Sequence, residues 1–129
     1  MEQELFDLLS ELEMRAEKER LQGLSAGEGL QILAPDSAKL LSTLATSNKA
    51  KTIVEIGSGV GYSTLWLAYA ASLTGGKVIT CEIDPAKAEE ARANVEQAGV
   101  AEFVEVLAGD ARELLRHREE PFDFLFIDG

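Results

Sequence analysis

From Lys51 onward, short apolar runs alternate with segments of helical periodicity, and this rhythm limits the possible folds more than any other feature. The pattern predicts strands at residues 52–56, 77–81, 102–107 and 122–127. Helices are predicted at 62–73, from the Asp84-Pro85 cap to Gly99, and after Asp110, where Glu113 completes the spacing of a capping box. Such alternation is typical of an α/β fold with a parallel sheet and right-handed crossovers. We expect about four strands in the order 3-2-1-4, with helices on both faces.

The first part of the chain has only helical patterns. Residues 3–22 place an apolar stripe on one helical face, formed by Leu5, Leu8, Leu9, Leu12 and Ala16. The segment "QGLSAGEG" then interrupts the pattern with three glycines. Pro35 suits the first position of a second helix, which we expect to run to about Ser47 with Leu40, Leu41 and Leu44 facing inward. The predicted organisation is a helical N-terminal arm at 1–34 and an α/β unit at 35–129.

Composition excludes several classes of function. The 129 residues carry a formal net charge of -11, so binding to nucleic acid or to anionic lipid is not expected. No run approaches the ~18 apolar residues of a membrane helix, and the acidic start does not resemble a signal peptide. A single cysteine cannot form an internal disulfide, so we expect a protein of the reducing cytoplasm. Cys81 and His117 are the only residues of their types, which excludes zinc sites and Cys-His nucleophilic pairs. Cys81 is interpreted as a small core residue and His117 as a solvated one.

A glycine-rich turn follows the first predicted strand in "TIVEIGSGVGYSTLWLA". Gly57, Gly59 and Gly61 allow a tight turn that a ligand can approach closely. Glu82 follows Gly61 by 21 residues, at the end of the second strand, where an acidic side chain is expected to bind a ribose diol. The alternative interpretation of Glu82 is a solvated carboxylate. Because Tyr62 stands where the dinucleotide fingerprint requires glycine, the turn suits a nucleoside ligand without a pyrophosphate.

Four motifs in unbroken order then resemble one family. "VEIGSGVGYSTLWLA", "GKVITCEIDPAKAEEARANVEQAGV", "VEVLAGDARELL" and "PFDFLFIDG" are similar to the successive motifs of the class I S-adenosylmethionine-dependent O-methyltransferases. The nearest branch is the cation-dependent one with the catechol and caffeoyl-CoA O-methyltransferases. The resemblance covers residues 33–129 and implies a Rossmann-like methyltransferase half. A different nucleoside-binding α/β protein remains an alternative, disfavoured by Tyr62 and the other motifs.

The resemblance implies roles for matching positions. Glu55 and the Gly57–Gly61 loop are expected at the methionine part of the cofactor, Ser63 at its carboxylate, and Glu82 at the ribose. Ile83 is expected to pack on the adenine, and Asp110 and Ala111 to hydrogen-bond it. Asp110 has the competing role of a helix cap. The full set of cofactor-binding candidates is Glu55, Gly57, Ser58, Gly59, Gly61, Tyr62, Ser63, Glu82, Ile83, Asp110, Ala111 and Asp128, and Asp128 is also the candidate ligand for a divalent cation such as magnesium.

The resemblance also implies what the chain lacks. The family's sheet continues beyond the fourth strand, with a lysine and an Asp-Asn pair that complete the metal site, whereas this sequence ends one residue after Asp128. The expected function is that of the cofactor-binding half of an O-methyltransferase for a small-molecule hydroxyl, inactive alone and truncated after the fourth strand. The alternative is a non-catalytic interaction module. We expect a homodimer, formed through the free edge of the fourth strand in preference to the helical arm.

Overall fold

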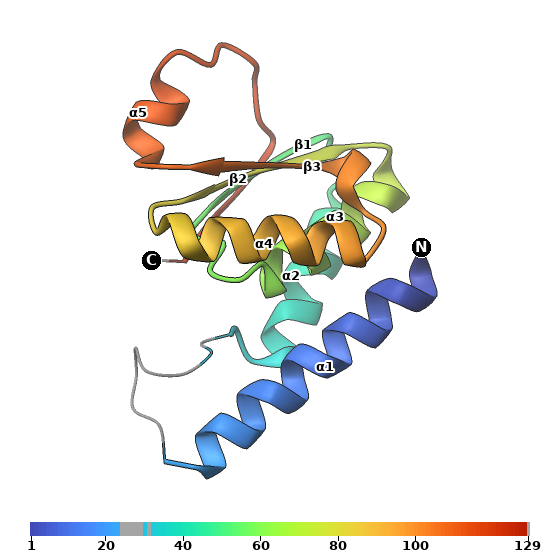
Figure 1. Cartoon of the computed structure of the whole chain (residues 1–129). Helices are drawn as coiled ribbons and strands as arrows, with labels where there is room; N and C mark the ends of the chain where they lie inside the picture. Colours follow the sequence, from blue (N-terminus) through green and yellow to red (C-terminus); the bar gives the residue numbers. More distant parts are fainter. Residues whose placement is uncertain (24–29, 31, 129) are drawn as a thin grey trace.

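The computed structural model describes residues 1–23, 30 and 32–128 (Figure 1). Two helices come first, and strands alternate with helices afterwards. In chain order the elements are α1 (Glu2–Leu21), α2 (Pro35–Ser47), β1 (Thr52–Ile56), α3 (Tyr62–Thr74), β2 (Lys77–Glu82), α4 (Pro85–Gln97), a short 3₁₀ turn (Ala101–Phe103), β3 (Val104–Ala108), α5 (Ala111–Arg116) and β4 (Phe124–Ile127). No helix in these described parts is both long and apolar enough to cross a membrane.

The four strands form one sheet in the order β3-β2-β1-β4, and every neighbouring pair is parallel. This confirms the predicted α/β fold and strand order. The order reverses between β2, which lies on one side of β1, and β4, which lies on the other. In open α/β sheets, ligands bind beyond the carboxyl ends of the strands at such a reversal. The fold therefore points to the ends of β1, β2 and β4 as the place to look for a site.

Helices cover the two faces of the sheet unequally. Figure 1 shows α2, α3 and α4 on one side of the sheet and α5 alone on the other. Phe124 and Phe126 of β4 pack on the side of α2 and α3, against a core that includes Leu41, Ile53 and Leu67. Leu125 and Ile127 alternate with them and are 46% and 64% exposed. The α5 side of β4 is thus an open apolar surface.

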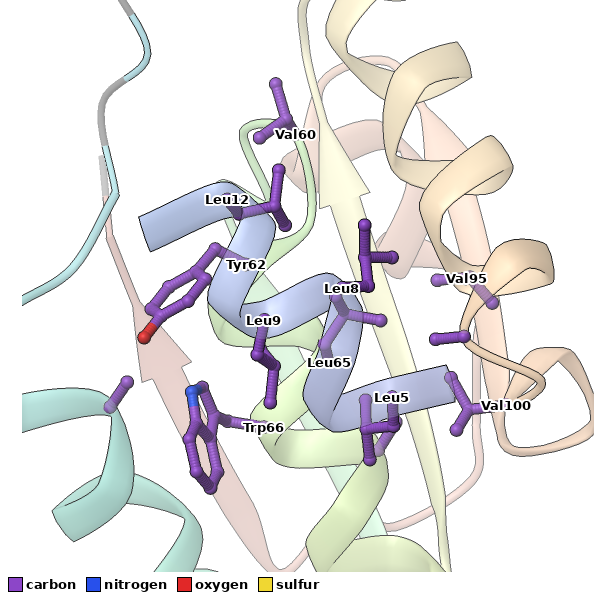
Figure 2. Close-up of a cluster of buried hydrophobic side chains, with 13 residues drawn as sticks. Leu5, Leu8, Leu9, Leu12, Val60, Tyr62, Leu65, Trp66, Val95 and Val100 are labelled. Carbon is purple, nitrogen blue, oxygen red and sulfur yellow. The ribbon is translucent and has the colours of Figure 1, made fainter. Parts of the chain in front are cut away.

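The N-terminal helix is part of the main core. Leu5, Leu8, Leu9 and Leu12 of α1 are buried, and Figure 2 shows them in one cluster with side chains of α3 and α4, among them Leu65, Trp66 and Val95. Tyr62 strengthens this contact, because its hydroxyl donates a hydrogen bond to Glu13 of α1 at 2.6 Å. The predicted leucine stripe is confirmed at these four leucines. The stripe is covered by the chain itself, so the arm and the sheet unit share one core.

Three details of the prediction are wrong. Leu40 and Leu44 face outward, at 59% and 46% exposure, because α2 buries the stripe of Ala38, Leu41, Ser42 and Ala45. Its small members allow α2 to lie close to α3, where Ser42 Oγ donates to the carbonyl of Trp66 at 2.9 Å. The third strand begins at Val104, after the 3₁₀ turn, and the fourth at Phe124. The predicted break at 24–29 lies outside the described residues.

Candidate functional site

A cleft of about 860 Å³ lies at the carboxyl ends of the strands. Its walls come from the β1–α3 loop, the ends of β2 and β4, the start of α5, and residues 32–34 before α2. The structure brings together ten of the twelve predicted site residues in this lining: Gly57, Ser58, Gly59, Tyr62, Ser63, Glu82, Ile83, Asp110, Ala111 and Asp128. Glu55 and Gly61 lie outside it, for reasons that their contacts explain.

The β1–α3 loop depends on glycine. Gly57, Gly59 and Gly61 have φ angles of 94°, 56° and 99°, in the left-handed region that side chains with a Cβ rarely adopt. A Cβ on Gly61 would lie 3.3 Å from both Cα and Cβ of Ala91 in α4. Gly61 therefore allows the loop to pack against α4, while Gly57 and Gly59 face the cleft.

Glu82 stands at the end of β2 and is only 7% exposed. One carboxylate oxygen accepts the N–H of Gly59 at 2.8 Å, and the other accepts the N–H of Asp84 at 2.9 Å. The interpretation of Glu82 as a freely solvated carboxylate is therefore wrong. Each carboxylate oxygen has a second acceptor position. Glu82 can still accept hydrogen bonds from a ligand in the cleft.

Glu55 of β1 lies behind the loop and is fully buried. Its carboxylate accepts hydrogen bonds from Ser63 at 2.5 Å, from Thr80 at 2.7 Å, and from Thr64. Burial raises the pKa of Glu55, the three hydroxyl groups oppose this rise, and the charge of Asp128 adds to it. Glu55 does not line the cleft. Its three contacts instead link β1 to β2 and to the start of α3.

The first turn of α3 faces the cleft through Tyr62 and Ser63. Its N-cap residue is Gly61, and no side chain caps the turn. A helix start with uncapped N–H groups carries a partial positive charge and attracts anionic groups. The structure thus offers a carboxylate-sized anion a place at α3, next to the glycine loop.

The opposite wall combines an apolar surface with a helix start. Ile83 is 70% exposed and lines the cleft, so it offers a face on which a flat ring can pack. Asp110 caps α5 by accepting the N–H of Arg112 at 2.9 Å, which confirms the predicted cap. Glu113 pairs with Arg116, so the second half of the capping box is not formed. The side chain of Arg112 also donates to Asp110 and lowers the pKa of that carboxyl group.

Asp128 follows β4 at the rim of the cleft, and its N–H donates to the carbonyl of Ile56 at 2.8 Å. Within the described residues, no group of three or more His, Cys, Asp or Glu side chains is arranged to hold a metal ion. Magnesium prefers near-octahedral oxygen coordination with one or two carboxylates. The donors present here do not form such a centre around Asp128.

Sequence reasoning missed several lining residues. Ile32, Leu33 and Ala34 close one end of the cleft, and Lys87 and Arg112 add positive charge to its walls. Lys87 lies in the first turn of α4, three residues after the Asp84 cap, so its nearness to the strand ends could have been inferred. The contribution of 32–34 has no local signal, because it depends on where the folded chain places the segment before α2 relative to the strand ends. The predicted core role of Cys81 agrees with its burial, which raises the pKa of the thiol.

Comparison with known proteins gives one consistent family. Residues 54–129 match the family model described as a methyltransferase domain. A catechol O-methyltransferase of Mycobacterium tuberculosis is 42% identical over 97 residues, covering 74% of this chain and 44% of that protein. An O-methyltransferase of Bacillus cereus, solved in complex with SAH, superposes with a TM-score of 0.75 at 35% identity, over 95% of this chain and 54% of its own. A cofactor-bound protein from MTB has a TM-score of 0.79 at 35% identity, over 95% and 53%. The chain spans about half the length of the relatives it matches.

Proposed function

Because this chain belongs to the class I S-adenosylmethionine-dependent O-methyltransferase family, we propose that its cleft is the cofactor site of an enzyme that methylates a hydroxyl group of a small molecule. The observation that carries the proposal is the convergence of three features on one cleft. These are the glycine loop, the Glu82 carboxylate and the uncapped start of α3. Together they offer acceptors for a diol, close backbone approach, and donors for a carboxylate.

Each wall of the cleft suits one part of S-adenosylmethionine. Glu82 would accept from the ribose hydroxyls, and charge assistance makes such bonds roughly twice as strong as neutral ones. The N–H groups at the start of α3 would hold the methionine carboxylate. Ile83 would pack on the adenine, and the N–H of Ala111 and the Asp110 carboxylate would hydrogen-bond its edge. Gly57, Ser58 and Gly59 would lie along the methionine and sulfonium part.

When bound, the cofactor supplies an electrophilic methyl group for attack by an acceptor oxygen. The residues of this chain contribute binding and orientation, which raise the rate by holding the reactants together. The described side chains around the cleft do not assemble a metal centre. We expect the 129-residue chain alone to give no methyl transfer to a catechol acceptor above background, as mass spectrometry of the product would measure.

Isothermal titration calorimetry with S-adenosylhomocysteine tests the cofactor proposal. We expect saturable binding at one site per chain, and a loss of about 1.5–3 kcal/mol of binding free energy in Glu82→Ala, as for hydrogen bonds to a charged group. Glu96→Gln, an exposed change in α4, should bind like the wild type. A folded wild-type chain with no binding at millimolar ligand would refute the proposal.

We also propose that the chain forms a homodimer through the free edge of β4. Phe122, Leu125 and Ile127 are 54%, 46% and 64% exposed, and unpaired strand edges favour pairing with another strand. The rival surface, the leucine stripe of α1, is buried within the chain. Light scattering should show a wild-type dimer, a monomeric Leu125→Glu variant, and a dimeric Leu40→Glu control. A monomeric wild type, or a dimer that survives Leu125→Glu, would contradict the proposal.

A further inference from the structure

One side chain joins the two backbone segments that form the centre of the cleft. Glu82 accepts the N–H of Gly59, in the β1–α3 loop, and the N–H of Asp84, in the turn from β2 to α4. Both contacts lie within the chain itself, and Glu82 is only 7% exposed. A carboxylate whose only role was to bind a diol would not need hydrogen bonds to the backbone on both sides.

We propose that Glu82 is a positioning residue for the glycine loop, in addition to the ligand contact that rests on the proposed function. Its bond to Gly59 holds the loop in its binding shape before the cofactor arrives. Preorganised groups contribute more to affinity, because less ordering remains to be done on binding. Part of the affinity attributed to a Glu82–ribose contact would then come from the loop.

The other anchors of the loop make this role specific. The N–H of Gly57 donates to the carbonyl of Cys81 at 2.8 Å, which continues the ladder of β1 and β2. On the far side, Asn94 of α4 donates to the carbonyl of Val60 at 2.8 Å. Gly59 lies between these two points with a φ of 56°, and its N–H has Glu82 as acceptor. Within the loop, the N–H of Gly61 also donates to the carbonyl of Ser58 at 2.9 Å. Loss of the Glu82 carboxylate therefore frees the N–H of Gly59, while the internal bond and both ends of the loop remain.

The geometry lets Glu82 hold the loop and bind a ligand at once. An ionised carboxylate has about four acceptor positions, and the bonds to Gly59 and Asp84 use one on each oxygen. One position on each oxygen remains for a donor in the cleft that Glu82 lines. Glutamine at this position keeps one acceptor oxygen and places an amide N–H₂ group against a backbone N–H, so it can satisfy only one of the two segments.

The first experiment measures amide hydrogen exchange in the ligand-free protein. Hydrogen exchange of the Gly59 amide, followed by NMR, should accelerate about tenfold in Glu82→Ala and by a smaller factor in Glu82→Gln, the scale expected when one structural hydrogen bond is lost. Glu96→Gln removes a charge from the exposed side of α4 and should leave the Gly59 rate unchanged. Equal Gly59 exchange in the wild type and Glu82→Ala would overturn the proposal, whatever the protein binds.

The second experiment separates the loop from the ribose. The affinities of wild type and Glu82→Gln are compared for S-adenosylhomocysteine and for an analogue without both ribose hydroxyls. If Glu82 also positions the loop, the variant still binds the analogue at least about threefold more weakly than the wild type does. If wild type and Glu82→Gln bind the analogue with equal affinity, Glu82 acts only through its contact with the ribose, and the positioning role is refuted. Absence of wild-type binding would refute the proposed function, and the Gly59 exchange rate would still decide the positioning role.

Discussion

At the scale of single residues, side chains that do not line the cleft shape it from behind. Glu55 holds Ser63, Thr64 and Thr80 together, and Asn94 holds Val60. Asn94 is buried in α4 and is not part of the cleft lining. Its amide reaches across to the loop, so its effect on a ligand is exerted through the loop backbone.

We predict that Asn94→Ala weakens both folding and ligand binding. The variant leaves the carbonyl of Val60 without its donor, which should lower the free energy of unfolding by about 1–3 kcal/mol. Urea denaturation gives this value, and calorimetry with S-adenosylhomocysteine should show reduced affinity under conditions where the variant is folded. The matched control is Gln97→Ala at the exposed end of α4. Wild-type affinity in a folded Asn94→Ala protein would show that the loop does not need this anchor.

Single residues can be predicted from the sequence where a local backbone conformation requires one type of residue. The sequence predicts a tight turn at the three glycines, and the structure has all three at positive φ angles. It also predicts Asp110 as a cap, because the spacing of a cap to its helix is local. Glu82 was placed correctly at the end of β2, but its bond to Gly59 was not predicted. That bond joins residues 23 positions apart, and it depends on how β1 and β2 lie side by side.

At the scale of elements, α1 behaves as a core helix. Leu9 is 1% exposed and lies in the cluster formed with α3 and α4. Leu9→Ala should lower the free energy of unfolding by about 2–5 kcal/mol, the usual cost of such a cavity. Chemical denaturation provides the measurement, with the exposed Ser10→Ala change in the same helix expected within about 0.5 kcal/mol of wild type. A loss below about 1 kcal/mol for Leu9→Ala would mean that α1 is only loosely attached.

The start of β4 is fixed by the carboxylate of Asp123. Its oxygens accept the N–H of Lys51 at 2.9 and 3.1 Å and the N–H of Thr52 at 3.0 Å. These backbone hydrogen bonds lower the pKa of Asp123, and the bond from Lys51 has the largest effect. Because the pKa is lower in the folded state, the ionised group stabilises the fold above the unfolded pKa of about 3.9, and this contribution is lost as the pH falls through the folded value.

We therefore predict a pH-dependent effect of Asp123→Ala. At pH 7 the variant should lose about 1 kcal/mol of unfolding free energy, a value reduced for the exposure of this side chain. The difference from wild type should shrink below about pH 4. Denaturation curves between pH 2 and 7 test this, with Glu119→Ala in the preceding loop as a control. A difference that stays constant with pH would show that the carboxylate charge is not responsible.

The elements also show where sequence patterns fail. Strand order and direction followed from the alternation of strands and helices, and the boundaries of β1 and α2 agree with their predicted ranges. The inward face of α2 did not follow, since a choice between leucine and alanine faces depends on how closely α3 approaches. Large apolar residues suggested one face, whereas the packed face is built from Ala38, Leu41, Ser42 and Ala45.

At the scale of the whole molecule, one cleft unites the loop, the β2 carboxylate and the start of α3. A second, more open hollow of about 700 Å³ lies along α1, beside Met14, Glu17 and Leu21. Among the residues that the structure describes, the two linings have none in common. The two hollows therefore give a spatial control for any ligand titration.

The most direct test of the account is a ¹⁵N NMR titration of the chain with S-adenosylhomocysteine. We predict that the amide signals of Gly57, Gly59, Ser63, Ile83 and Ala111 shift together and saturate, while those of Glu17 and Leu21 in α1 stay in place. An unchanged, well-dispersed spectrum at millimolar ligand would contradict the central claim that this cleft is a cofactor site, as would shifts confined to α1 around Glu17 and Leu21.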